Sequence, residues 1–347
     1  MSKGRRRRKG ASRLRRLALR GGIAFTALLV AWGWLSVWFV HHSRSWLDRQ
    51  RLSRPKFVTA PLFWFGNPLG DITDALGITG HDAVYEYDEP APSGSVLFAG
   101  APVRVARPAP DDITVLDRGE FLVGWSQKLR HPVWCAYHVP AEAKGEAGPR
   151  PNFTKDKSVA GAPPASAYER SGYDRGHMVP NYAIATRFGD DMQRATFRTT
   201  NIAPQSPRLN RGPWRDIEHR IADLWTARWG EIWVIVGCIS GNTRETLTGT
   251  DIDVPRQYYQ IVVAEEEIEP DRYEVRAFAV LFDQELSLGT WPTRNLVTID
   301  ELEELSGLDF LPDLPEFIQR PLESELPSRL WPIRRRDIFR QMSIRFR

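Results

Sequence analysis

A histidine, an asparagine and a glutamate near the middle of the chain have the side chains that a one-metal phosphodiesterase site needs. His177 ends the run Asp174-Arg175-Gly176-His177, and a later polar cluster contains Asn210 and Glu218. Histidine can take a proton from water near neutral pH. The amide oxygen of asparagine is a hard, neutral ligand that suits Mg²⁺, and a glutamate can hold water around such an ion. The three residues therefore indicate hydrolysis of a phosphodiester assisted by one metal ion.

The spacing of Asn210 and Glu218 indicates that they have different roles at the metal ion. Asn210 and Glu218 are eight residues apart, which is about 12 Å along a continuous helix. Two groups that far apart do not readily share one small cation, and Mg²⁺ usually keeps several waters. We therefore expect Asn210 to bind the ion directly and Glu218 to act through water, while His177 activates the attacking water from the other side.

The charge of the chain is distributed unevenly. The 347 residues carry a formal net charge of +4, but ten of the 47 Lys and Arg residues lie in residues 1–20, which contain no acid. The remaining 37 basic residues face 43 acidic ones, a net charge of −6. A basic body that binds nucleic acid over a wide surface is therefore excluded, and binding of a polyanion must depend on a local patch and a metal.

Residues 21–40 contain no charged residue and are predicted to span a membrane. Twenty helical residues rise about 30 Å, the thickness of the hydrocarbon layer. Trp32, Trp34 and Trp38 gather toward one end of the segment, as aromatic residues do at membrane interfaces. A buried core helix would show a polar stripe, and a cleaved signal peptide would have a shorter apolar run before a small-residue cleavage site. An uncleaved anchor is therefore favoured over both.

The basic residues around this segment predict its orientation. Ten Lys and Arg residues precede it, whereas residues 41–60 contain five, so the basic end is expected to stay in the cytoplasm. The body of the protein then faces outward, with the bacterial periplasm as the expected compartment. A mitochondrial leader would space its arginines along an amphipathic helix, but Arg5 to Arg8 are consecutive.

The body shows the patterns of a mixed fold of strands and helices. Strands are predicted over 62–65, 83–87, 121–126, 133–139, 231–238, 257–264 and 273–282. The segment 231–238 is almost entirely apolar, as in a strand that is buried on both faces. A helix is predicted from Pro213 to a stop at Gly230, and a second over 299–305, before Gly307. Cys135 and Cys238, both in apolar runs, predict two buried thiols, with a single disulfide as the alternative.

Three motifs in this order resemble the DNA/RNA non-specific endonucleases, the ββα-metal group that includes mitochondrial endonuclease G. The motifs are Tyr173-Asp174-Arg175-Gly176-His177-Met178-Val179-Pro180, Thr200-Asn201-Ile202-Ala203-Pro204-Gln205, and Leu209-Asn210-Arg211-Gly212-Pro213-Trp214 followed by Glu218. The resemblance extends from about Phe121 to Trp331. It implies a metal-dependent endonuclease that hydrolyses DNA and RNA and leaves 5′-phosphate and 3′-hydroxyl ends.

The resemblance also implies a role for each matching residue. His177 is similar to the general base, Asn210 to the direct ligand of Mg²⁺ (with Mn²⁺ as an alternative), and Glu218 to the glutamate that orients the water around the ion. Arg150 is similar to the arginine that steadies charge on the phosphate. Asp174 is expected to shape the site.

Further residues are expected around this centre by the same resemblance. Arg175 and Arg211 are expected at the substrate, and Asn201 is expected to tie down the loop beside the metal. Gln260 stands where the family often has lysine, which predicts one phosphate contact fewer. Members of the family are often dimers, so a homodimer is one state that the resemblance allows.

The expected fold class is α+β: a ββα-metal nuclease core with a central, mainly antiparallel sheet flanked by helices, preceded by one transmembrane helix. The predicted segments are a basic cytoplasmic tail (1–20), the anchor (21–40), a stalk and covering segment (41–115), the nuclease domain (116–333) and a basic C-terminal tail (334–347). The alternative function is a nuclease fold with weak or no activity that serves as a nucleic-acid-binding or envelope scaffold protein.

Overall fold

The structure is a computed structural model that describes residues 84–87, 95–286 and 292–331. The predicted anchor at 21–40, the predicted strand at 62–65 and both basic tails lie outside these ranges. Within them, no helix has the length and the apolar composition needed to cross a membrane.

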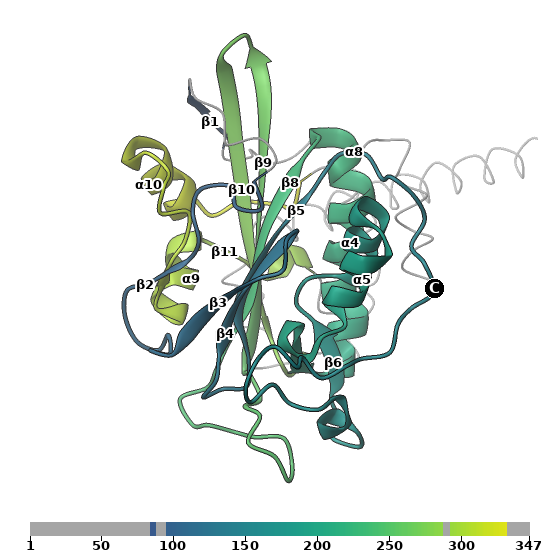
Figure 1. Ribbon diagram of the computed structural model, residues 1–347. Helices are drawn as coiled ribbons and strands as arrows, with labels where there is room; N and C mark the ends of the chain where they lie inside the picture. The colour runs from purple at the N-terminus through teal and green to yellow at the C-terminus, as the bar shows by residue number, and fades with distance from the viewer. Residues whose placement is uncertain (1–83, 88–94, 287–291, 332–347) are drawn as a thin grey trace, which may run out of the picture. The chain divides into compact units, whose positions relative to one another are not determined.

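A central antiparallel sheet of eight strands organises the described residues (Figure 1). Across it, the strands run in the order β1 (Val84–Tyr87), β10 (Arg272–Asp283), β9 (Gln257–Glu269), β8 (Ile232–Ile239), β5 (His131–Val139), β4 (Phe121–Ser126) and β3 (Ile113–Asp117), while β11 (Leu296–Val297) pairs with β10. Two further pairs join β2 (Val103–Arg104) to β12 (Leu308–Asp309), and β6 (Asp174–His177) to β7 (Ile202–Gln205). The mixed fold with a central antiparallel sheet is therefore confirmed.

The middle of the sheet shows why an unbroken apolar run becomes a strand here. All eight residues of β8 are buried. Successive side chains point to opposite faces, so Val234 and Val236 pack into one core while Trp233 and Ile235 pack into another. The prediction that segment 231–238 is buried on both faces is confirmed.

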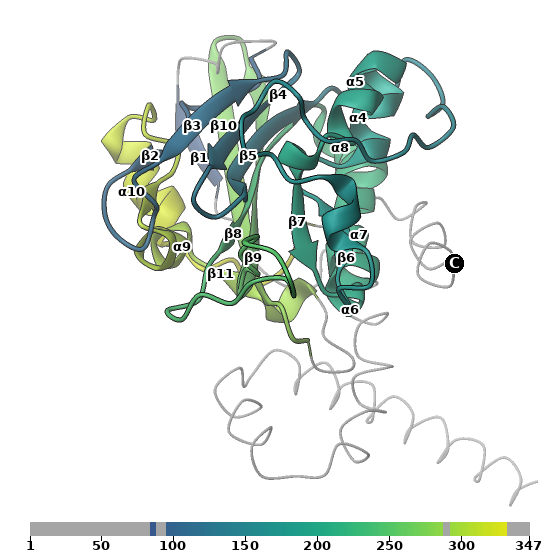
Figure 2. The same cartoon turned by 60° about the horizontal axis from the view of Figure 1, so that its bottom comes forward.

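Helices cover both faces of the sheet (Figures 1 and 2). One face carries α4 (Asn181–Phe188), α5 (Asp190–Thr196), α6 (Pro207–Leu209), α7 (Arg215–His219) and α8 (Thr226–Trp229), and the other carries α9 (Ile299–Ser306) and α10 (Glu316–Ser324). Short 3₁₀ turns lie at Ala165–Tyr168, Thr199–Asn201 and Pro292–Arg294. The predicted apolar stripe of the long helical segment, including Trp214, Ile217 and Ile221, fills the first core, and Leu302 and Ile318 fill the second.

The helical segment from α6 to α8 is interrupted where the sequence analysis assumed continuity. Gly212 has φ −107° and ψ −119°, outside the helical region, so a straight 12 Å spacing from Asn210 to Glu218 is wrong. Beyond this kink the predicted helix is confirmed, although Asn210–Trp214 and Arg220–Trp225 form wider π-helical turns. It ends at Gly230, whose φ of 82° suits glycine.

The second predicted helix is confirmed as α9, and its ends show why it forms. The Thr298 hydroxyl accepts a hydrogen bond from the Glu301 amide at 2.9 Å, and Gly307 ends the helix in the left-handed conformation. Cys135 and Cys238 are both buried free thiols, which confirms the first interpretation of the cysteines and excludes a disulfide between them in this structure.

Candidate active site

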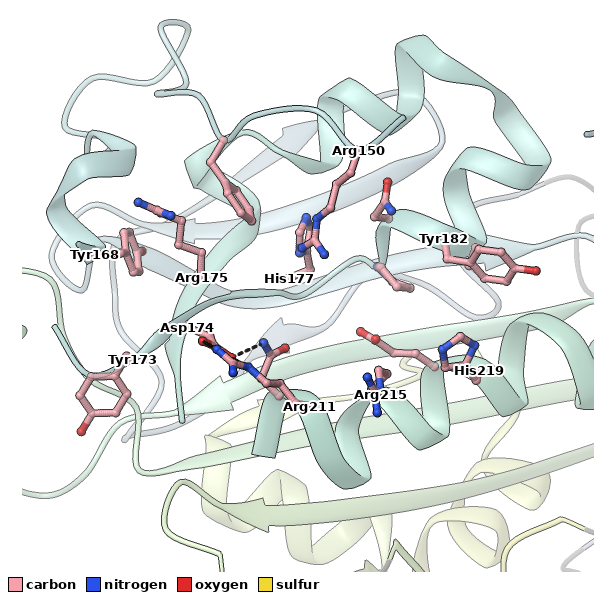
Figure 3. A pocket seen from close by; sticks show the side chains of 16 residues that line it. Arg150, Tyr168, Tyr173, Asp174, Arg175, His177, Tyr182, Arg211, Arg215 and His219 are labelled. Carbon is pink, nitrogen blue, oxygen red and sulfur yellow. Dashed lines mark hydrogen bonds and ion pairs between the residues drawn. The ribbon is translucent and has the colours of Figure 1, made fainter. Parts of the chain in front are cut away.

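A cleft of about 550 Å³ opens between β6 and α4 on one side and the helical segment with α7 on the other. Figure 3 shows Arg150 and His177 above the cleft and Arg211, Arg215 and His219 on the helix below it. Arg215 and His219 are four residues apart within α7, which places them on one face of that helix, whereas Arg211 lies before the kink at Gly212. Two distant parts of the sequence therefore build opposite walls of one site.

The β6–β7 pair positions His177. Gly176 lies opposite Ala203, and a Cβ atom on Gly176 would lie 2.5 Å from the side-chain oxygen of Gln205. Only glycine allows this close approach, which explains the glycine before the histidine. His177 then points into the cleft as the last residue of its strand.

The surroundings of His177 keep its imidazole neutral. The ring is 8% exposed and packs between Phe153 and Phe197, at centroid distances of 5.1 and 4.7 Å. Burial, followed by the charge of Arg150, lowers the pKa of His177 to about 3. Within the part of the chain that the structure describes, its Nε2 makes no hydrogen bond. Nε2 of His177 is therefore buried and without a hydrogen-bond partner among the described residues, and it is the atom that a reacting water would have to reach.

Asp174 connects the two walls of the cleft. Its Oδ2 accepts hydrogen bonds from Nδ2 of Asn210 at 2.9 Å and Nε of Arg211 at 2.8 Å, and its Oδ1 accepts one from Nη2 of Arg211 at 2.6 Å. Burial opposes ionisation of this carboxyl, but the hydrogen bonds from Arg211 and Asn210 outweigh it and lower the pKa of Asp174. Because Asp174 takes the NH₂ group of Asn210, the amide oxygen is left as the acceptor.

The carboxyl group of Glu218 is largely shielded from water. Burial raises its pKa to about 8, although Trp214, Arg150 and Arg215 pull it the other way. A cation beside this group would favour its ionised form. The cleft thus offers an amide oxygen on Asn210 and a carboxylate on Glu218, an all-oxygen set of the kind that Mg²⁺ prefers. These residues fit a hard divalent cation.

Arginines supply the positive charge of the cleft. Arg150 is exposed, with its guanidinium 5.4 Å from the ring of Phe197. Arg175 lies over Phe153 at 5.5 Å, and its Nε donates to the carbonyl of Ala165 at 2.9 Å. Both are therefore supported by the aromatic residues that also pack on His177.

The structure brings together the seven residues that were predicted to be catalytic, metal-binding or substrate-binding. His177, Arg150, Glu218, Asp174, Arg175, Arg211 and Asn210 all line this cleft. Asn201 lies deeper: its side chain bonds to the backbone of Val179 and to the carbonyl of Thr196. Gln260 is buried in β9, 1% exposed, and does not line the cleft.

Sequence reasoning missed several residues that line the cleft. These are Tyr168, Tyr173, Tyr182, Arg215 and His219, together with other neighbours of the predicted groups. The spacing of Arg215 and His219 could have linked these two residues to each other, since residues four apart share a helix face, but the kink at Gly212 breaks this rule between Arg211 and Arg215. No local pattern links Tyr182 to His219, because their proximity depends on how α4 meets α7.

Comparisons with known proteins agree on one family. A sequence model described as DNA/RNA non-specific endonuclease matches residues 100–317. The chain is 29% identical to a nuclease from a Nostoc species, over 69% of this chain and 89% of that protein. It is 28% identical to the mitochondrial nuclease EXOG of mouse, over 55% of each chain, and so spans about half the length of that relative. It is also 26% identical to human mitochondrial endonuclease G, over 57% of this chain and 69% of the relative.

A solved structure supports the fold. The chain matches a protein in the crystal structure of the EndoG/EndoGI complex, described with the mechanism of EndoG inhibition, with a TM-score of 0.52 and 23% identity. The match covers 58% of this chain and 87% of that one. At this level of identity the likeness concerns the fold.

Proposed function

The chain belongs to the DNA/RNA non-specific endonuclease family and is a hydrolase that acts on nucleic acids, and on this premise we propose that it is a metal-dependent endonuclease that cuts DNA and RNA to 5′-phosphate and 3′-hydroxyl ends. One observation carries the proposal. The neutral imidazole of His177 shares one cleft with the oxygen donors of Asn210 and Glu218.

His177 is the general base in this proposal. Its ring takes a proton from a water molecule, whose oxygen forms a new bond to phosphorus while the bond from phosphorus to the 3′ oxygen breaks. The phosphate stays on the 5′ side, and the 3′ oxygen takes up a proton to become a hydroxyl. A pKa of about 3 keeps His177 unprotonated before the reaction, but it also lies below the range in which a general base is most efficient at neutral pH, so the bound phosphate has to raise it for proton transfer.

The other residues of the cleft hold the phosphate and a cation. In this proposal Arg150 offsets the charge that grows on the phosphate, and Arg175 and Arg211 are further phosphate contacts; all three line the cleft, which supports these roles. Asn210 would hold Mg²⁺, or Mn²⁺, directly and Glu218 would hold it through water. When bound, such an ion supplies positive charge that offsets negative charge on the phosphate and the leaving oxygen. Asp174 keeps the oxygen of Asn210 turned away from its own carboxylate through the hydrogen bond at 2.9 Å.

A nuclease assay on the full chain tests this function. Supercoiled plasmid and single-stranded RNA are incubated with the protein and Mg²⁺, with EDTA, and with EDTA followed by excess Mg²⁺. We expect cleavage of both substrates, loss with EDTA and recovery with Mg²⁺. Products should accept a 5′ label only after phosphatase treatment. Binding of both substrates without cleavage under any of these conditions would favour the inactive scaffold instead.

For residues 21–40 we propose a membrane anchor that places the nuclease domain outside the cytoplasm, most simply in a bacterial periplasm. The support is the uncharged composition of this segment and the ten basic residues before it. An external protease added to cells with a permeabilised outer layer should digest the nuclease domain. Protection of that domain would reverse the orientation.

A further inference from the structure

The cleft continues beyond the proposed catalytic centre to a pair of rings, Tyr182 and His219. Tyr182 is the second residue of α4, and His219 is the last residue of α7. Their ring centroids lie 5.8 Å apart with planes at 46°. Figure 3 shows both at one end of the cleft, with Tyr168 and Tyr173 at the opposite end and His177 between the two ends.

The carboxylate of Asp223 lies near both rings and holds one of them. The hydroxyl of Tyr182 donates a hydrogen bond to Oδ1 of Asp223 at 3.0 Å, and Nδ1 of His219 lies 4.0 Å from Oδ2 of the same residue. The Asp223 side chain is only 13% exposed. The hydrogen bond holds the polar edge of Tyr182 at the wall, whereas His219 is only near the same carboxylate.

Tyr182 is partly exposed although its hydroxyl is hydrogen-bonded. It is 37% exposed, and among the exposed large hydrophobic residues in the described ranges it is the one that lines the cleft. An apolar ring at the rim of a polar cleft is suited to a flat partner.

The two rings lie close to the proposed catalytic residues, and His219 is also close to them in the sequence. His219 directly follows Glu218, and Arg215 lies one helical turn before it. A nucleic acid whose phosphate reaches His177 and Arg150 would continue along the cleft, so one of its neighbouring nucleotides would lie at Tyr182.

We propose that Tyr182 and His219 form a stacking subsite for an unpaired nucleobase next to the phosphodiester that is cut. This proposal rests on the function proposed above and adds a substrate class to it. Stacking on aromatic rings tolerates every base, because every base has a π face. It therefore suits an enzyme without sequence preference.

The subsite also predicts which nucleic acids are preferred. Both faces of a base inside a duplex are covered by its neighbours, so it must leave the stack before it can lie on Tyr182, which costs free energy. Single-stranded DNA and RNA present free bases at no such cost. We therefore expect single-stranded substrates to be cut faster than duplex DNA of the same sequence.

A substrate with one cleavable bond tests the subsite. In a short single-stranded oligonucleotide, every linkage except one is an uncharged methylphosphonate, and the base on either side of the remaining phosphodiester is replaced in turn by an abasic residue. For the wild-type protein, one of the two replacements should lower kcat/KM by about 5- to 100-fold, the range of one base–aromatic stack. In the Tyr182→Ala protein the same abasic replacement should lower kcat/KM by less than about twofold, because this protein has no ring on which the base could stack.

Matched variants keep the result specific. Tyr182→Phe retains the ring and should keep most of the abasic penalty, whereas Tyr182→Leu fills the space without a ring and should lose it even if the alanine variant folds poorly. Phe317, 71% exposed on α10, is a control aromatic outside the cleft, and Phe317→Ala should behave as wild type. An abasic penalty that is equal in wild type and Tyr182→Leu would overturn the subsite.

A binding measurement distinguishes failure of the stacking subsite from failure of the proposed nuclease function. Fluorescence anisotropy with the His177→Ala protein reports affinity for the intact and abasic oligonucleotides without cleavage. If wild type cuts no substrate but Tyr182→Leu still abolishes the abasic penalty in binding, the nuclease proposal fails and the subsite stands. If cleavage is normal and binding shows no dependence on Tyr182, the subsite fails alone.

Discussion

Two buried histidines show how the surroundings of a side chain decide its chemistry. Burial lowers the pKa of His177 to about 3, and Arg150 adds to that shift. Burial also acts on His131, but Cys238 and the hydrogen-bonded Asp253 outweigh it and raise the pKa of His131 to about 10. His131 bonds to Asp253 at 3.3 Å outside the cleft, so it serves as a structural ion pair. His177 is neutral, and its buried Nε2 has no hydrogen-bond partner among the described residues.

Asn210 allows a prediction about the metal at the scale of one side chain. Asn210→Ala should raise the Mg²⁺ concentration needed for half-maximal cleavage by at least about tenfold. Mutating a residue that only hydrogen-bonds to a metal ligand already weakens metal binding by about 10- to 100-fold, and Asn210 is proposed as a ligand itself. Higher Mg²⁺ should recover part of the rate. The measurement is a Mg²⁺ titration of initial rate. Arg208→Ala, an exposed neighbour on α6, is the control, and an Asn210→Ala curve that matches it would remove Asn210 from the metal site.

At the scale of elements, local patterns specify strands and helix ends, while the site depends on long-range contacts. The apolar run of β8 and the Thr298 and Gly307 caps of α9 could be read directly from the sequence. The kink at Gly212 could not, because a glycine is compatible with a helix and with a break. The hydrogen bond from Asn210 to Asp174 joins residues 36 apart. Motif resemblance identified both residues, but only the folded chain reveals their contact.

The contact between α9 and α10 should make stability depend on pH. Oxygen atoms of Asp300, Glu303 and Glu323 lie within 4.8 Å of one another. Burial, with the neighbouring carboxylates, raises the pKa of Glu303 to about 7 and of Glu323 to about 8. The folded state therefore holds more protons than the unfolded state above the ordinary glutamate pKa of 4.5. Stability from these groups is present below pH 4.5 and is lost as the pH rises toward about 8.

Glu323→Gln tests this dependence, because glutamine keeps the shape and removes the titration. Between pH 6 and pH 9 the melting temperature of wild type should fall more than that of the variant. The melting temperature of wild type should fall by about 2–4 °C more than that of the variant if wild type loses on the order of 1 kcal/mol more free energy of unfolding over this pH range. Glu316→Gln on the same helix, 85% exposed, should follow wild type. If wild type and Glu323→Gln lose the same number of degrees, Glu323 does not carry the effect.

At the scale of the whole molecule, charge is separated between the cleft and the β9–β10 hairpin. The end of this hairpin projects from the sheet (Figure 1) and carries acidic residues: Glu265, Glu266, Glu267, Glu269, Asp271 and Glu274. The cleft carries the arginines Arg150, Arg175, Arg211 and Arg215. A nucleic acid should therefore be attracted at the cleft and repelled by the hairpin, which keeps the electrostatic footprint short.

This separation predicts a weak dependence of binding on salt. Four phosphate contacts, one for each cleft arginine, would give a slope of log affinity against log salt no steeper than about −3.6 on duplex DNA, at roughly 0.9 for each contact. Arg150→Gln should reduce the slope by about one contact. The affinity of the His177→Ala protein is measured over a range of NaCl concentrations. A slope that requires eight or more contacts would show that a larger surface binds the substrate.

The rate of cleavage by His177→Ala tests the central claim most directly. The full-length variant is compared with wild type on a single-stranded oligonucleotide at saturating Mg²⁺, with affinity measured in parallel. His138→Ala is the control, because His138 packs against Trp233 away from the cleft. We expect kcat to fall by about 10²- to 10⁴-fold in His177→Ala, with affinity changed less than about twofold because phosphate contacts remain. Cleavage by His177→Ala at a rate close to that of wild type would contradict the assignment of His177 as the base.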